Sequence, residues 1–171
     1  MGVSIIKAVR GFEPKFGQNC FFADNSVVVG DVIMGDNCTV WFNAVVRGDV
    51  NSIRIGNNTN IQDGAIIHCT YLKARTTIGN NVSIGHNAIV HGCVVEDNVL
   101  IGMGAIVMDN AVVRAGAVIA AGAVVLQDMD VEAGTIYAGV PAKKIKAAGE
   151  EMRLLIERTA KNYPMYAEWF K

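Results

Sequence analysis

The chain has 171 residues, 51% of them hydrophobic, which is enough for one continuous core and excludes a disordered protein. Its 15 basic and 16 acidic residues give a net charge of −1, and no basic run is interleaved with aromatic residues, so we expect neither nucleic acid nor a membrane as a partner. Residues 1–16 contain no apolar segment of signal-peptide length, and the four cysteines show no CxxC spacing, which together predict a cytoplasmic protein.

An aliphatic residue returns every six positions along most of the chain. A period of six fits neither the 3.6-residue turn of a helix nor the alternation of an ordinary strand. It predicts an all-β fold, a parallel β-helix in which each hexad forms one side of a triangular prism and three hexads complete one coil. The repeated positions are Val28, Met34, Val40 and Val46; Ile55, Ile61 and Ile67; Ile78, Ile84 and Val90; and Val95, Ile101, Val107, Val113, Ile119 and Val125.

The period is interrupted at three places. The intervals 46–55, 67–78 and 90–95 measure nine, eleven and five residues, and the longest contains the loop CTYLKARTT, residues 69–77. Departures from a regular local pattern often mark functional sites. We therefore expect the function to lie near these interruptions.

Beyond the last repeat the pattern fades through residues 126–145, a loop and a final strand that close the predicted β-helix domain, residues 1–145. In residues 146–171, apolar side chains at helical spacing predict an amphipathic helix of about 12–15 residues that ends before Pro164. The stripe consists of Met152, Leu155, Ile156 and Thr159. The aromatic tail, residues 163–171, is expected to anchor this helix on the prism.

Three residues, Arg47, His68 and His91, each directly follow a repeated aliphatic residue. Their separations, 21 and 23 residues, equal one coil plus an insertion, which predicts one column on one prism side. Asp63 and His86, two positions after their aliphatic residues, form a second column on the preceding side. The loop could also be counted as part of two hexads, which would put His68 and His86 on one side. We prefer the first count because side chains one coil apart, ~4.8 Å, can bring two imidazole nitrogens onto one metal ion.

His86 cannot reach that metal within its own chain, because it lies a full prism side away. If three prisms pack around a threefold axis, His86 of one subunit faces the column with His68 and His91 of the next. The same packing brings Asp63 against Arg47. This arrangement predicts a homotrimer with metal sites shared between subunits.

Three motifs occur in order along the chain: RGD at 47–49, NIQDGAIIH at 60–68 and IGHNAIVHGC at 84–93. On a hexapeptide scaffold they resemble the signature of the γ-class carbonic anhydrases, and the resemblance covers nearly the whole chain. It implies a left-handed β-helix and a homotrimer with a zinc-type site at each interface. The metal ligands would be His68 and His91 of one chain and His86 of the next.

The resemblance also implies roles for five other residues. Arg47 and Asp63 would form an ion pair between subunits, Asp49 would support the same region, and Gln62 would orient metal-bound water or hydroxide. Tyr137 would sit near the site. Three neutral imidazoles leave Zn²⁺ a full charge and an open position, so that bound hydroxide could hydrate CO₂ to bicarbonate at neutral pH. Fe²⁺ or Co²⁺ could occupy the same site.

The chain departs from the family archetype, which carries an acidic loop and a glutamate proton shuttle after the RGD-like motif. Here Val50 follows Asp49, and residues 69–77 contain no carboxylate. CO₂ hydration is therefore expected to be slow. The alternatives are a hexapeptide acyltransferase with one histidine as general base and CoA between subunits, a metal-dependent acyl-CoA thioesterase, and a non-catalytic trimer stapled by metal.

Overall fold

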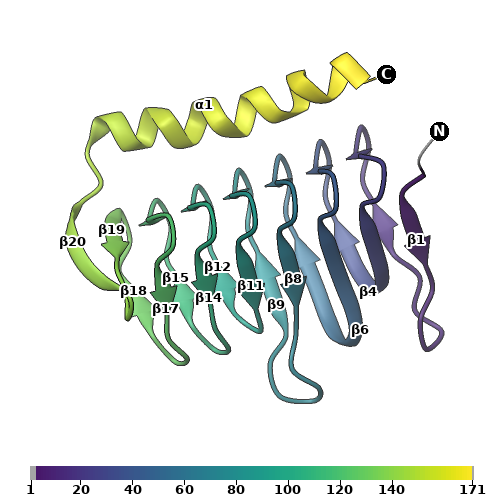
Figure 1. The fold of residues 1–171 in the computed structure, drawn as a ribbon, viewed down its shortest axis with the longest axis horizontal. Coiled ribbons are helices and arrows are strands. Elements are labelled where there is room, and N and C mark those ends of the chain that lie inside the picture. The colour runs from purple at the N-terminus through teal and green to yellow at the C-terminus, as the bar shows by residue number, and fades with distance from the viewer. Residues whose placement is uncertain (1–2, 171) are drawn as a thin grey trace.

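In a computed structural model, residues 3–170 are described, and they form a parallel β-helix with one long helix lying along its side (Figure 1). Met1, Gly2 and Lys171, at the ends of the two predicted segments, lie outside the described residues. The strands are β1 (Ile5–Lys7), β2 (Lys15–Phe16), β3 (Phe21–Phe22), β4 (Val27–Met34), β5 (Thr39–Val40), β6 (Val45–Ile55), β7 (Asn60–Ile61), β8 (Ile66–His68), β9 (Thr76–Ile78), β10 (Ser83–Ile84), β11 (Ile89–His91), β12 (Val94–Val95), β13 (Leu100–Ile101), β14 (Ile106–Val107), β15 (Val112–Val113), β16 (Val118–Ile119), β17 (Val124–Val125), β18 (Asp130–Val131), β19 (Thr135–Ala138) and β20 (Lys143–Ala147). The helices are α1 (Glu150–Ala167) and the short 3₁₀ helix η1 (Glu168–Phe170).

The strands form two sheets whose order follows the coils. The 8-stranded sheet runs β20-β19-β16-β13-β10-β7-β5-β3, and the 12-stranded sheet covers the other two prism sides. These sides are joined because β6 pairs with β8 through Val46 and with β9 through Ile55. The nine-residue interval of the sequence is thus one long strand that continues around the corner. Among the paired strands of residues 3–170, pairing is parallel throughout the coils, and β19 and β20 pair antiparallel where the chain leaves the prism.

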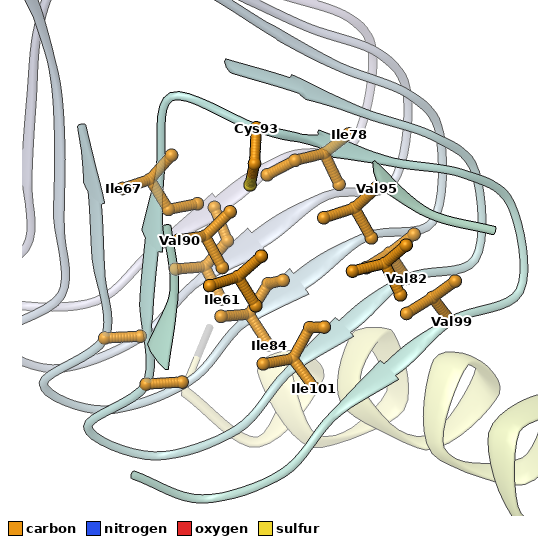
Figure 2. Close-up of a cluster of buried hydrophobic side chains, with 14 of the residues drawn as sticks. Ile61, Ile67, Ile78, Val82, Ile84, Val90, Cys93, Val95, Val99 and Ile101 are labelled. Carbon is orange, nitrogen blue, oxygen red and sulfur yellow. The ribbon is translucent and has the colours of Figure 1, made fainter. Parts of the chain in front are cut away.

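The repeated aliphatic side chains fill the prism. Ile61, Ile84 and Ile101 pair in register on successive coils, are fully buried and point into the interior, as Figure 2 shows. Strand spacing of ~4.8 Å brings each aliphatic side chain against its counterpart one coil away. The six-residue period is therefore explained by packing along a single axis.

Asparagines form the corners of successive coils. Asn58, Asn81 and Asn98 have φ of 54°, 56° and 57°, a left-handed conformation that asparagine tolerates better than most residues. Their amides join in a ladder: the Nδ2 of Asn58 donates to the Oδ1 of Asn81 at 3.1 Å, and the Nδ2 of Asn81 donates to that of Asn98 at 3.1 Å. The corners thus repeat with the coils and stay in register.

Helix α1 differs from the expected helix in length. It has 18 residues and includes Pro164, so the prediction that it ends before this proline is wrong. A proline removes one backbone donor, but near the end of a helix the loss is small against the tertiary contacts that follow it. Tyr163 and Phe170 pack on Trp41 of the prism, with ring centroids 5.4 Å and 5.7 Å apart, which confirms the aromatic tail as an anchor.

The helix buries one narrow face on the prism. Of the predicted stripe, Ile156 is buried, and the deepest contacts otherwise come from the small residues Ala160 and Ala167. Strand β20 runs across position 145, so the division of the chain there stays a prediction. None of the helices within residues 3–170 has the length and hydropathy needed to span a bilayer.

Candidate metal centre

His68 and His91 lie side by side at the ends of the parallel strands β8 and β11. They are paired residues in the strand register, and Ile67 pairs with Val90 just before them. The His68 Nδ1 is 3.1 Å from the His91 Nε2. This register follows the first of the two counts made from the sequence, because the connection between β8 and β9 projects from the prism as a loop instead of adding a further prism side (Figure 1).

Arg47 and Asp49 hold His68 from the previous coil. Val46 pairs with Ile67, which places Arg47 in the same column as His68. The Asp49 carboxylate is 3.0 Å from the His68 Nε2 through one oxygen, and its other oxygen accepts from Arg47 at 2.6 Å. Burial alone would raise the pKa of Asp49, but the hydrogen bonds from His68 and Arg47 lower it, so this residue is a carboxylate at neutral pH.

The environment of His68 favours its neutral form. Burial has the largest effect on the pKa of His68 and lowers it. The charges of Arg47 and His91 lower this pKa further, whereas the hydrogen bond and the charge of Asp49 raise it. A neutral imidazole is the form that binds metal ions. His68 is therefore available as a ligand at neutral pH.

His91 has a carboxylate partner that the sequence analysis missed. Its Nδ1 is 2.5 Å from an oxygen of Asp109, whose other oxygen accepts a hydrogen bond from the Thr70 hydroxyl in the projecting loop. Asp109 follows His91 by 18 residues. The coil is only 17 residues long here, because the interval 90–95 has five residues and Val90 pairs with Val107, so the column count gives Met108 and not Asp109 as the residue one coil after His91.

Asp63 and His86 lie on the other sheet, as the second column predicts. The His86 Nδ1 is 2.9 Å from an Asp63 oxygen, and both side chains are 41% exposed. Ile61 and Ile84, two positions earlier, pair in register. Within one chain these two residues therefore contact each other and present an exposed surface.

Two other predicted site residues, Gln62 and Tyr137, are buried. The Gln62 side chain is buried and donates to the Asn60 side chain at 3.0 Å, next to the column with Asp63. Tyr137, 8% exposed, occupies an aliphatic position in β19, which is separated from β10 by β13 and β16 in the sheet. The structure does not bring Tyr137 to the histidines. Val50 packs against the hydrophobic core, so a carboxylate introduced at position 50 would not face the site.

The two facing nitrogens fit a metal ion. A carboxylate accepts hydrogen bonds, so Asp49 favours a proton on the Nε2 of His68 and Asp109 a proton on the Nδ1 of His91. The His68 Nδ1 and the His91 Nε2 then both present lone pairs, and a cation or a proton between them is needed to offset their repulsion. Two nitrogens at 2.0–2.1 Å from one tetrahedral ion would be about 3.3–3.4 Å apart, close to the separation seen here.

Within the described part of one chain, no third ligand side chain stands beside the two histidines. Among residues 3–170 of one chain, no group of three or more His, Cys, Asp or Glu side chains is arranged to hold a metal ion. A pocket of about 290 Å³ opens beside the two-histidine pair. It is lined by Ile89, His91, Ile106, Met108, Asp109 and Gln127.

Known proteins with similar sequences carry related names. The family model for bacterial transferase hexapeptide (six repeats) matches residues 13–48, 75–106 and 92–127. A protein named "Probable carbonic anhydrase" from Methanocaldococcus jannaschii is 42% identical over 88% of this chain and 94% of its own length. The mitochondrial gamma carbonic anhydrase 2 of Arabidopsis thaliana is 40% identical over 88% of this chain and 56% of its own length.

Two further comparisons extend over nearly the whole chain. Protein YrdA of Escherichia coli is 38% identical over 93% of this chain and 90% of its own length. The crystal structure of a hexapeptide transferase family protein from Anaplasma phagocytophilum has a TM-score of 0.93 at 36% identity and covers 98% of both chains. The fold and the sequence thus agree on one family of hexapeptide-repeat proteins.

Proposed function

The chain belongs to the γ-class carbonic anhydrase family of hexapeptide-repeat proteins, and we propose that it hydrates CO₂ to bicarbonate at metal sites shared between the subunits of a homotrimer. One observation carries the proposal: the 3.1 Å separation of two imidazole nitrogens whose opposite ring nitrogens both contact carboxylates. Two facing imidazole nitrogens suit metal binding, whereas a mechanism with one histidine as general base uses a single imidazole and gives no reason for the second ring to face it.

Each residue of the column has a distinct task in this proposal. His68 and His91 supply two ligands through Nδ1 and Nε2, and His86 of a neighbouring subunit supplies the third. When bound, Zn²⁺, Fe²⁺ or Co²⁺ would supply a Lewis acid that lowers the pKa of a bound water molecule, to about 7 in the case of Zn²⁺. Asp49 and Asp109 orient the two rings, and the Gln62 amide is the candidate for directing a reacting oxygen.

The proposed interface also uses Arg47 and Asp63. Within one chain, Arg47 pairs with Asp49 and Asp63 pairs with His86. The Arg47 and Asp63 side chains are nevertheless 45% and 41% exposed, so each can accept a further partner from another subunit. An ion pair between them would define the register of the trimer, the best-attested use of such pairs.

The chain lacks the carboxylates that, in the family archetype, carry the proton away from the metal site. Residues 69–77 contain no carboxylate, and Val50 packs on the core. We therefore expect buffer molecules to remove the proton produced by CO₂ hydration. We also place the protein in the cytoplasm, a reducing compartment that suits its four unpaired cysteine thiols.

Stopped-flow CO₂ hydration by zinc-loaded wild-type protein tests the proposal, with His91→Ala as the metal-site variant. Hydration that depends on zinc and is lost in His91→Ala is the expected result. Hydrolysis of acetyl-CoA, or acetyl transfer from it, without CO₂ hydration would favour the thioesterase or the acyltransferase instead. The transferase name of the structural relative makes this comparison necessary.

A further inference from the structure

Asp109 joins three segments at the edge of the candidate metal centre. It lies two residues after β14, contacts the His91 ring at the end of β11, and accepts a hydrogen bond from Thr70 in the projecting loop. Its two oxygens thus have different partners: one faces the His91 Nδ1 and the other the Thr70 hydroxyl. Neither contact uses the nitrogen of His91 that faces His68.

The carboxylate decides which nitrogen of His91 is free. A neutral imidazole carries one proton, on either Nδ1 or Nε2, and the two tautomers present lone pairs on opposite sides of the ring. A carboxylate against Nδ1 stabilises the proton there and leaves the lone pair on Nε2. Thr70 restricts rotation of the carboxylate, because turning it would break the hydrogen bond to the hydroxyl.

The contrast with His68 shows that local carboxylates set this choice. Asp49 contacts the Nε2 of His68, so that ring presents its Nδ1, whereas His91 presents its Nε2. The two rings, tilted by 60° with centroids 5.1 Å apart, thus present different nitrogens to one point. Hydrogen bonds of this kind to a ligand's second nitrogen typically change metal affinity by about 10–100-fold.

We propose that Asp109 is a positioning residue that holds His91 as its Nδ1–H tautomer, with Thr70 fixing the carboxylate, and thereby sets the affinity of the metal site. The inference rests on the metal site of the proposed function but not on CO₂ as the substrate. Asp109 and Thr70 act through His91 and need not touch a substrate.

The test compares Asp109→Asn and Asp109→Ala with the matched control Asp128→Asn, which changes an exposed carboxylate at a nearby corner. Zinc affinity is measured by competition with a chromophoric chelator, and the His91 tautomer by ¹⁵N chemical shifts in metal-free protein. We expect Asp109→Ala to lose about 10–100-fold in affinity and to show mixed tautomers, with Asp109→Asn affected less and the control unchanged. Thr70→Val should weaken zinc binding, and Thr70→Ser, which keeps the hydroxyl, should restore it.

Asp109→Ala protein that binds zinc with wild-type affinity would overturn the proposal. This holds also if the substitution lowers the melting temperature of the metal-free protein, because Asp109 would then have only a structural role. The measurements separate this inference from the proposed activity. A wild-type protein that binds zinc, loses affinity in Asp109→Ala and fails to hydrate CO₂ would support the positioning role and reject the proposed function. A wild-type protein with no zinc affinity would overturn both.

Discussion

The Nδ1 of His68 lies 3.1 Å from the Nε2 of His91, on two parallel strands whose register places the residues directly opposite each other. Each ring uses its remaining nitrogen for a carboxylate, Asp49 in one case and Asp109 in the other. In the proposed function this pair supplies two of the three metal ligands, and His86 of another subunit supplies the third.

Removal of metal should loosen the trimer. Because the ligands come from two chains, metal binding and association are linked, and metal at 100 times its dissociation constant would stabilise the folded assembly by about 2.7 kcal/mol. Light scattering and thermal unfolding before and after chelation measure this effect, with re-added zinc as the control for reversibility. A protein that binds metal as a stable monomer would contradict the shared site.

Subunits with different histidine substitutions should complement each other. His68→Ala and His86→Ala should each lose metal to the same extent as homotrimers. In mixed trimers, an interface with His86 from a His68→Ala chain and the column from a His86→Ala chain regains all three histidines. Metal content of verified mixed trimers is the measurement, and no recovery of metal in them would show that the three histidines do not share a site between chains.

CO₂ hydration should depend on buffer. Because residues 69–77 carry no carboxylate, proton removal should limit kcat, which should rise with the concentration of a small imidazole-type buffer. The ratio kcat/KM, which reports the CO₂ step, should change little. Stopped-flow assays at constant pH and ionic strength measure both. A high kcat that does not change with buffer would reveal a proton route within the protein.

Trp41, on which Tyr163 and Phe170 pack, should contribute strongly to the free energy of unfolding. Trp41 is 6% exposed, packs against Tyr163 and Phe170, and donates its ring N–H to the Thr39 hydroxyl at 3.0 Å. Trp41→Ala should lower the free energy of unfolding by about 3–5 kcal/mol, as measured by denaturant unfolding of metal-free protein.

Trp169, 71% exposed, provides the matched control for this substitution. Trp169→Ala should change the free energy of unfolding by no more than about 0.5 kcal/mol. Equal effects of the two substitutions would show that the helix is not anchored through Trp41. Proteolysis of residues 150–170 in Trp41→Ala gives a second readout, since an undocked helix is cleaved faster.

Tyr163 should make the protein sensitive to high pH. Burial raises the pKa of Tyr163 to about 12, with further contributions from the charges of Asp63 and Tyr166. The unfolded chain releases this proton near pH 10, so the folded state holds more protons between pH 10 and 12 and stability falls as pH rises through this window.

Comparison with Tyr163→Phe isolates this effect from other groups that titrate at high pH. Between pH 9 and pH 11, the free energy of unfolding should fall more in wild-type protein than in Tyr163→Phe. Tyr71→Phe, at an exposed tyrosine, should behave like the wild type. A fall of the same size in wild type and Tyr163→Phe would show that Tyr163 ionises normally.

The six-residue period predicted the β-helix, and the same count, combined with the spacing that two ligands of one metal ion require, predicted both columns. In this fold each strand contacts the strand one coil away, so a fixed number of residues converts directly into a neighbour in space. His68 and His91, and Asp63 and His86, could therefore be paired by counting. The same count does not give Asp109, because Val90 pairs with Val107 over 17 residues and Met108 is the residue one coil after His91; only the side-chain contact in the structure identifies Asp109.

Only the tertiary structure decided how the irregular segments are used. The interval 67–78 contains too many residues for one hexad, and its length is equally compatible with a longer loop or a further prism side; strand pairing of Ile67 with Val90 selects the loop. Val50 sits in the extra length of β6, where the aliphatic count gives no orientation, and packing on the core determines it. Pro164 predicts a helix end locally, but contacts of Tyr163 and Phe170 with Trp41 carry the helix past it, because tertiary packing outweighs the preference of one residue.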